Sequence, residues 1–319
     1  MGAPLLKLVG KRIGLSIGLL FAVSVLIFVG TQILPGDVAQ SILGQAATPE
    51  AVANLRAQLG LNDPAYVRYF HWLFGLLTGN LGTALSNGLP IGPAIAERLK
   101  NTLFLAFWAA AVSIPLSIIL GLIAVRHKNG FIDKLISAST LAAISLPDFF
   151  IGYLLIYFVA VKLGWFTSVS TVYDGMPFLS RMVAIALPAL TLTLVVLAQM
   201  MRMTRAAILN VMQSAYVETA ELKGLSRSEI IWRHAFPNAV APIINVVMLN
   251  LAYLVVGVVV IEVIFVYPGM GQYLVDHVAK RDVPVVQDCG LIFAAVYIGL
   301  NMLADIFSIL SNPRLRHPK

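Results

Sequence analysis

Six long apolar runs set the limits on what this chain can fold into. They lie at 13–33, 102–125, 135–161, 182–201, 243–265 and 289–310. Each is long enough to cross a hydrocarbon core of roughly 30 Å as a helix. Hydrophobic residues fill 59% of the 319 positions and charged residues only 12%, too few to cover the surface of a soluble domain. Because backbone polar groups in lipid must be bonded within the structure, we expect an all-α integral membrane protein with six transmembrane helices.

The N-terminus and the charge distribution predict an orientation. Residues 1–12 are basic and precede an apolar run longer than that of a signal peptide, so we expect a retained first span. Six spans put both termini on one side, and fourteen of the 22 Lys and Arg residues fall on that side. The positive-inside rule then places residues 1–12, the tail 311–319 and the segment 202–237 in the cytoplasm.

The connection at 34–101 is too long for a simple loop and contains two helix signals. Thr48 is a suitable N-cap before a proline at the first helical position, and Gly60 ends that short helix. A second helix is expected at 65–77, after Pro64. Its aromatic residues are Tyr66, Tyr69, Phe70, Trp72 and Phe74. Such side chains favour the membrane interface, so we expect an external region whose short helices lie on the membrane.

The segment 202–237 is polar and lies between two apolar runs. Its residues before Gly224 are helix formers, and glycine closes a helix at C′ without steric cost. Ser226 stands three positions before Glu229, which is the pattern of a capping box that opens a second short helix. We therefore predict helix, tight turn and helix. A rigid projection of that kind suits the docking of another protein better than it suits chemistry.

Motifs for catalysis are missing from the sequence. It has no G-x-x-x-x-G-K-[ST] phosphate-binding loop, no H-E-x-x-H and no cysteine cluster. The single cysteine, Cys289, is expected to be packing. Gly269 and Gly271 have no strand before them, so we interpret that pair as a turn and not as a nucleotide loop. We predict that the chain is not an enzyme and holds no cofactor or metal.

The segment 202–237 resembles the EAA loop of ABC-importer permeases. That loop has the form E-A-A, three residues, G, nine residues, I-x-L-P. The matching residues are Glu218, Thr219, Ala220, Gly224 and Pro237. Thr219 stands where alanine is usual, His234 where isoleucine is usual and Phe236 where leucine is usual. The resemblance implies that the matching residues, with the cap formed by Ser226 and Glu229, couple the chain to an ATPase.

Further motifs narrow the resemblance to the peptide/nickel class and, within it, to the first (B-type) permease subunit. In the external region they are 34–37 (LPGD), 59–64 (LGLNDP), 79–82 (GNLG), 98–99 (RL) and 102–103 (TL). Toward the C-terminus they are Glu262 with Phe265, 268–271 (PGMG), 281–287 (RDVPVVQ) and 312–314 (NPR). Asn80 and Asn312 stand where the family usually has aspartate. The resemblance covers essentially the whole chain.

This resemblance implies a type I ABC importer permease fold, with the permease core over 98–310, in a bacterial inner membrane. The implied partners are a paralogous second permease subunit, two cytoplasmic ATPase subunits that bind ATP and Mg, an external substrate-binding protein and membrane lipid, with no nucleic acid. Di- or oligopeptides are the expected substrates. Nickel, glutathione or another small solute are the alternatives.

Two carboxylates in the apolar runs are candidates for the substrate path or a gate. Asp148 falls in mid-run after Pro147, where a charge costs about 2.5–3.5 kcal/mol, so it should face a cavity or a partner. It either meets a substrate ammonium or is a hydrogen-bonded residue at a helix break. Glu262, near the outer end of its run, is either a gate or interface residue or a carboxylate exposed to water.

Three other charged residues leave simpler alternatives. Asp305 in the last run is expected to pair with a basic residue near the cytoplasmic surface. Arg281 and Asp282, on an external loop, form either a salt bridge or a contact with the binding protein.

Two other classes of membrane protein compete with the importer interpretation. An ion-coupled secondary carrier could use Asp148 and Asp305, but such carriers usually show an internal repeat, which this sequence lacks. A membrane scaffold would need no polar path at all. The docking segment 202–237 argues against the carrier, and copurification with ATPase subunits would separate the importer interpretation from both alternatives.

Overall fold

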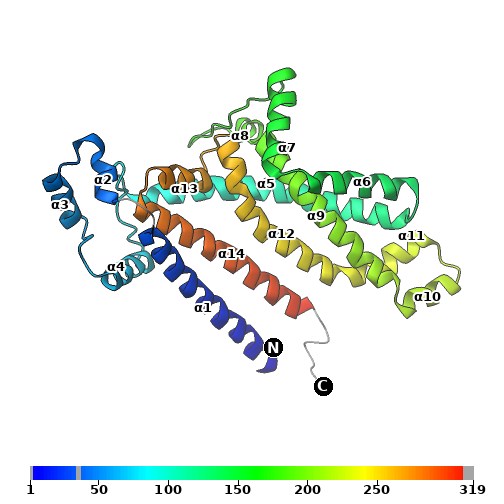
Figure 1. Ribbon diagram of the computed structural model, residues 1–319. Coiled ribbons are helices and arrows are strands. Elements are labelled where there is room, and N and C mark those ends of the chain that lie inside the picture. The colour runs from blue at the N-terminus through cyan, green and yellow to red at the C-terminus, as the bar shows by residue number, and fades with distance from the viewer. Residues whose placement is uncertain (1–2, 34–36, 312–319) are drawn as a thin grey trace.

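The computed structural model describes residues 3–33 and 37–311, and most of them are helical (Figure 1). Five helices are long and apolar enough to cross a membrane, and a bent pair is a sixth candidate. The five are α1 (Ala3–Ile33), α5 (Ile91–Arg126), α9 (Ala186–Met212), α12 (Phe236–Ile264) and α14 (Val283–Ser311). The expected all-α membrane architecture is confirmed. The motifs at 34–36 and 312–314 and most of the tail lie outside the described residues.

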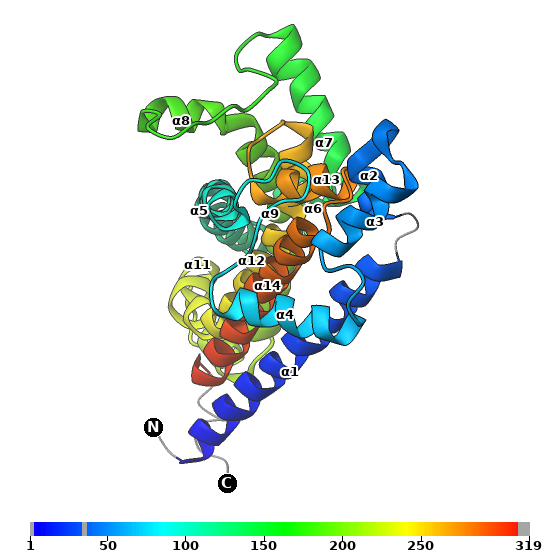
Figure 2. The ribbon, with the colours of Figure 1, turned by 90° about the vertical axis from the view of Figure 1, so that its left-hand side faces the viewer.

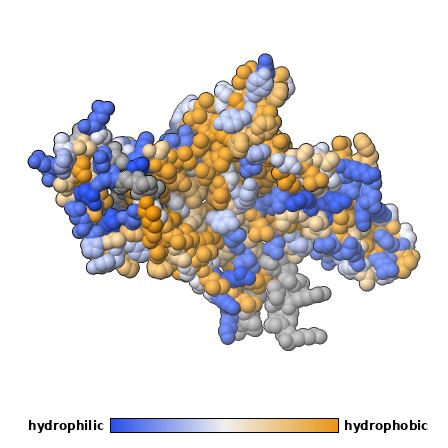
Figure 3. All heavy atoms as spheres, viewed as in Figure 1, coloured by the Kyte–Doolittle hydropathy of each residue, from blue (hydrophilic) through white to orange (hydrophobic). Residues whose placement is uncertain are grey.

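Helices α5, α9 and α12 form the core. α5 packs along α9, α12 packs on both α9 and α14, and α1 packs along α14 at one edge (Figures 1 and 2). Leu105, Leu192 and Val258 bring one buried side chain from each core helix into the main apolar cluster. Outside the core, apolar side chains cover much of the surface in Figure 3. A packed core with an apolar exterior is what a helix bundle embedded in lipid requires.

The third apolar run is not one helix. α6 (Phe131–Ser145) and α7 (Asp148–Leu155), which continues into the π-helical stretch η2 (Ile156–Lys162), meet at an angle of 101°. Leu146 between them is extended, with ψ of 135°, because a proline disfavours the helical conformation of the residue before it. The run 135–161, predicted as one spanning helix, is therefore two helices joined at a bend, and Asp148 lies directly after that bend.

Several helices extend beyond the predicted apolar runs. α5 begins well before residue 102, and α9, preceded by the short α8 (Phe178–Ala184), continues past residue 201 into the polar segment. α11 (Arg227–Glu229) and the π-helical η3 (Ile230–Ala235) run without a break into α12, so that one helix extends from Arg227 to Ile264. The predicted second short helix is therefore wrong, because it is the first part of this spanning helix.

Pro237 does not end that long helix. It stands where the π-helical stretch η3 passes into α12, and the wider π-helical turn before it gives the proline ring room. The side-chain amide of Asn238 donates to the carbonyl of His234 at 2.7 Å and partly replaces the regular helical bonding there.

The external region contains the two predicted helices. α3 (Pro49–Gln58) is capped by Thr48, whose hydroxyl accepts from the Ala51 amide, and α4 spans Ala65–Leu77 as predicted. The short α2 (Val38–Leu43) and η1 (Gly44–Ala46) precede them. Gly60, with φ of 63°, makes the predicted turn. Figure 2 shows α4 lying across α1.

Two of the five aromatic residues of α4 face the protein and not the membrane interface. Tyr69 is buried and its hydroxyl lies 2.8 Å from the hydroxyl of Ser24 in α1. Trp72 donates its indole N–H to the buried carboxylate of Asp288 in α14 at 2.8 Å. These two contacts hold α4 against the spanning helices, while Tyr66, Phe70 and Phe74 remain exposed.

Candidate functional site

The polar segment 202–237 folds into a helix and a tight turn that lead into the long helix. α10 (Ala215–Leu222) ends at Gly224, which has φ of 78°. The Gly224 amide donates to the Glu221 carbonyl and the Leu225 amide donates to the Ala220 carbonyl. This is the Schellman arrangement, and it confirms the turn predicted at Gly224.

The helix that follows the turn begins at the predicted cap. The hydroxyl of Ser226 accepts from the amide of Glu229 at 3.3 Å, which is one half of the capping box. The Glu229 carboxylate does not return to Ser226 but accepts from Arg233, one turn along, at 2.8 Å. The cap is therefore confirmed on the serine side only.

The two faces of α10 differ sharply. Val217 and Ala220 are buried against Ile230, so the small alanine side chain allows close packing inside the segment and does not face an external surface. On the opposite face Glu218 and Thr219 are exposed. Leu222, at the end of the helix, is 84% exposed, which is unusual for a leucine outside lipid. The exposed face thus combines a carboxylate with unpartnered apolar surface.

Rigid contacts join the segment to the spanning helices. Arg227 donates to the last-turn carbonyl of Val125 in α5 at 3.1 Å. Ile231 and Ala235 in η3 are buried in one cluster with Leu122 of α5 and Ile208 of α9. The segment that carries α10 is therefore packed against three spanning helices, namely α5, α9 and α12.

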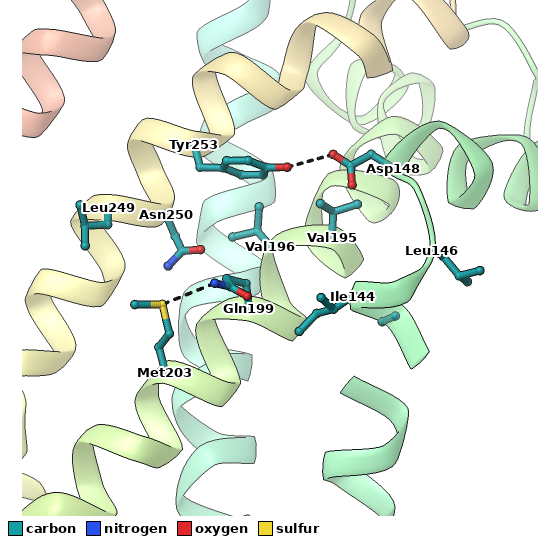
Figure 4. Close-up of a pocket in the computed structure, with 11 residues that line it drawn as sticks. Ile144, Leu146, Asp148, Val195, Val196, Gln199, Met203, Leu249, Asn250 and Tyr253 are labelled. Atoms are coloured by element: carbon teal, nitrogen blue, oxygen red, sulfur yellow. Dashed lines mark hydrogen bonds between the residues drawn. The ribbon is translucent and has the colours of Figure 1, made fainter. Parts of the chain in front are cut away.

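A cavity of about 380 Å³ opens between the bend of the third run and two core helices. Its walls come from the end of α6, the start of α7, the middle of α9 and the middle of α12 (Figure 4). The polar residues that line it are Asp148, Gln199, Asn250 and Tyr253. The Tyr253 hydroxyl donates to Oδ2 of Asp148 at 3.2 Å. The structure thus joins Asp148 to three polar residues that the sequence analysis did not single out.

The second candidate carboxylate, Glu262, is fully buried, which overturns the alternative of a carboxylate exposed to water. Its Oε1 accepts from the Thr102 hydroxyl at 2.6 Å. Its Oε2 accepts from the amides of Gly271 and Gln272 at 2.7 and 3.2 Å, in the first turn of α13 (Met270–Ala279). A buried carboxylate at this helix end satisfies amides that have no partner within the helix and complements the helix dipole.

Neighbouring polar residues extend this contact between α5, α12 and α13. Asn101 donates to the Pro268 carbonyl at 2.9 Å and accepts from Arg181 at 2.7 Å. The Tyr267 hydroxyl donates to the Asn101 carbonyl at 2.8 Å. Burial raises the pKa of Tyr267, so this donor keeps its proton. Glu262 therefore belongs to a closed network and does not line the cavity of Asp148 in this conformation.

The other charged candidates from the sequence analysis each contact a group of this chain. Asp305 in α14 pairs with Arg12 in α1 at 2.8 Å, as expected. Asp282 is buried and accepts from the amides of Leu85 and Ser86 at 3.1 and 2.8 Å, so its contact is with backbone and not with Arg281. Cys289 is buried packing, as expected.

A bundle of spanning helices with a helical projecting segment is the architecture expected of a transporter permease subunit. The chain belongs to the family described as binding-protein-dependent transport system inner membrane component, which matches residues 113–317. The N-terminal component of such proteins matches residues 5–103. The chain is thus a multi-pass ABC permease subunit, and the resemblance stated from the motifs is confirmed.

Curated relatives match over nearly the full length. A protein of Sinorhizobium fredii named "Probable peptide ABC transporter permease protein" is 33% identical over 96% of this chain and 98% of its own length. A relative from Brucella abortus, also named for peptide transport, is 36% identical over 97% of this chain and 99% of its own. The glutathione transport system permease protein of Escherichia coli K12 is 34% identical over 98% of this chain and 100% of its own.

Proposed function

We propose that this ABC permease subunit imports di- or oligopeptides and forms half of the translocation pore with a paralogous second permease. Relatives named for peptide transport support the peptide assignment, and the similarity to the glutathione permease keeps that γ-linked tripeptide as the second candidate. Nickel chelates are a third candidate, which only the resemblance of the motifs to the peptide/nickel class supports. The chain itself is proposed to be non-catalytic and to need no cofactor.

The proposed assembly places two ATPase subunits, which bind ATP and Mg, against the exposed face of α10. A substrate-binding protein docks on the external region at the other end. Both termini and segment 202–237 face the cytoplasm in this proposal, and the membrane is the bacterial inner membrane. The excess of Lys and Arg on the side of the termini supports that orientation.

One observation carries the coupling mechanism. The helix from Arg227 to Ile264 begins at the capped turn, carries Asn250 and Tyr253 on the cavity wall, and ends at the buried Glu262. Closure of the ATPases can bias the pore only through contacts that differ between the two pore states. This helix begins at the turn, lines the cavity and contacts α13, so a movement at the turn would change its contacts with both.

Reconstitution tests the proposed function directly. The chain is co-expressed with the second permease, the ATPases and the binding protein encoded beside it, and the complex is placed in proteoliposomes. ATP-dependent uptake of Ala-Ala supports the peptide assignment, and uptake of glutathione alone supports the second candidate. Failure of the ATPases to copurify with the chain would remove the coupling role. Uptake driven by a proton gradient without ATP would favour a secondary carrier.

The turn at Gly224 gives a sharper test of coupling. Gly224→Ala forces a Cβ into the left-handed region at a cost of about 1–2 kcal/mol. We expect ATP-dependent uptake or ATPase association to fall roughly threefold to tenfold, because the angle between α10 and the long helix changes. Gly175→Ala is the matched control, since Gly175 has φ of 82°, equally open surroundings and no place in the segment. Normal uptake in Gly224→Ala, or an equal loss in both variants, would count against the coupling role of this turn.

A further inference from the structure

The cavity beside the α6–α7 bend contains a carboxylate with spare bonding capacity. Asp148 is partly exposed to the cavity, and its Oδ2 accepts from Tyr253 at 3.2 Å. Its Oδ1 has no hydrogen-bond partner within residues 3–33 and 37–311, and no lysine, arginine or histidine lines the cavity there. In Figure 4 the carboxylate points across the cavity toward α12.

The surroundings of Asp148 complement a negative charge. Asp148 is the first residue of the eight-residue helix α7, and a negative charge in the first turn of a helix complements the helix dipole. The Tyr253 hydroxyl donates a further hydrogen bond to the carboxylate. Among the described residues no lysine, arginine or histidine forms an ion pair with Asp148. A charged side chain inside a membrane-spanning segment usually faces a charged partner or a ligand.

The other polar side chains of the cavity suit the rest of a small peptide. Gln199 lines the cavity, where its amide donates to the Met203 sulfur at 3.9 Å and its oxygen accepts from Arg202 at 3.2 Å. Asn250 donates to the Val246 carbonyl and keeps its oxygen as a free acceptor toward the cavity among the described groups. Apolar residues that line the same cavity include Ile144, Val195, Val196 and Leu249. A volume of about 380 Å³ lies in the range of small-ligand sites.

We propose that Asp148, with Tyr253 beside it, binds the ammonium group of the solute as it passes the cavity, and thereby favours solutes that carry a free amino group. This proposal rests on the proposed function of the chain as an importer pore. Peptides and glutathione share that ammonium, whereas a nickel chelate need not have one. The free oxygen of Asn250 then accepts from a peptide N–H of the same solute, and Gln199 lines the cavity beside it.

The first arm of the test measures the charge preference of the cavity without any transport. Cys289 is buried and is the single cysteine, so Ala143→Cys introduces one thiol on the cavity wall. The purified complex is treated with a trimethylammonium methanethiosulfonate and, separately, with a sulfonate methanethiosulfonate. We expect the ratio of cationic to anionic modification rates to fall at least about tenfold when Asp148→Asn is added.

Asp305→Asn is the matched control for this arm. It removes another carboxylate of a spanning helix, but Asp305 lies on α14, outside the cavity, and should leave the ratio unchanged. An unchanged ratio in Asp148→Asn, or the same decrease in Asp305→Asn, overturns the proposal. Protection of the introduced thiol by Ala-Ala, but not by N-acetyl-Ala-Ala, supports it.

The second arm uses uptake of Ala-Ala in proteoliposomes. Asp148→Asn is expected to lower the uptake rate roughly tenfold, whereas Tyr253→Phe, which keeps the charge and loses only the hydroxyl, is expected to lose about threefold or less. Equal losses in the two variants would show that the contact between α7 and α12 matters and not the charge, and would overturn the proposal. If the unsubstituted complex takes up no Ala-Ala, the peptide assignment fails, while the labelling arm still decides whether the cavity prefers cations.

Discussion

Replacing Gly269 by alanine should prevent the chain from reaching its folded state in the membrane. A Cβ on Gly269 would overlap the carboxylate of Glu262, which is fully buried and has no room to move. Glu262 is held there by Thr102 and by two amides of α13, so displacing it breaks three hydrogen bonds. We expect a loss of about 3 kcal/mol or more, measured as the yield of monodisperse protein after detergent extraction and as its melting temperature.

Substitutions of two further glycines test whether the loss comes from the clash with Glu262. Gly271→Ala should behave in the same way, because its Cβ would lie 2.6 Å from the Cα of Val259 and 2.9 Å from the Glu262 carboxylate. Gly299→Ala is the control, since a Cβ on Gly299, in helix α14, would meet no described atom within 4 Å beyond its own stretch of helix, and alanine is the better helix former. Normal yield and melting temperature in Gly269→Ala would contradict the tight packing of Glu262 on α13.

Local sequence signals were sufficient to predict the elements whose structure depends on residues close together in the chain. The helix at Ala65–Leu77, the Thr48 cap and the turn at Gly224 were all predicted correctly. Each depends on capping and turn residues only a few positions apart in the chain. Five of the six apolar runs likewise predicted spanning helices, because lipid leaves the backbone few alternatives.

Features that depend on distant residues could not be predicted. The sequence placed a proline before Asp148 but did not fix a bend of 101°, because the packing of α7 on α9 and α12 decides where the chain turns. Glu262 was placed near a surface because only its depth along the run was visible. Its burial follows from Thr102, 160 positions away in the chain, and from the glycines of the next turn.

The structure assigns different surroundings to the two candidate carboxylates. Asp148 and Glu262 were grouped as candidates for the substrate path, but they differ in surroundings. Glu262 has all its oxygens occupied by donors and ties the end of α12 to α5 and α13. Asp148 keeps an unpartnered oxygen toward a cavity within the described residues. The spare bonding capacity, and not the depth in the membrane, separates the residue proposed to bind solute from the residue that holds helices together.

A third carboxylate, Asp133, should have the second largest effect on stability. It is buried at the start of α6 and receives two hydrogen bonds from Arg205 of α9, at 2.9 and 2.8 Å, with the Asn129 amide at 3.0 Å. Asp133→Ala would leave the guanidinium in the seam between α6 and α9 without its bidentate partner. We expect a loss of about 3 kcal/mol, seen as a melting temperature lower by about 5 °C or more.

The pairing itself, and not the packing of either side chain, should account for that loss. In a double-mutant cycle, Asp133→Leu with Arg205→Leu should recover most of the stability lost in Asp133→Ala, because no charge is then left unpaired in the seam. Glu229→Ala removes the exposed partner of Arg233 and should cost less than about 1 kcal/mol. Equal losses for Asp133→Ala and Glu229→Ala would mean that the α6–α9 seam is solvated. Because α6 carries one wall of the Asp148 cavity, a seam held by this ion pair would fix that wall relative to α9 and Gln199.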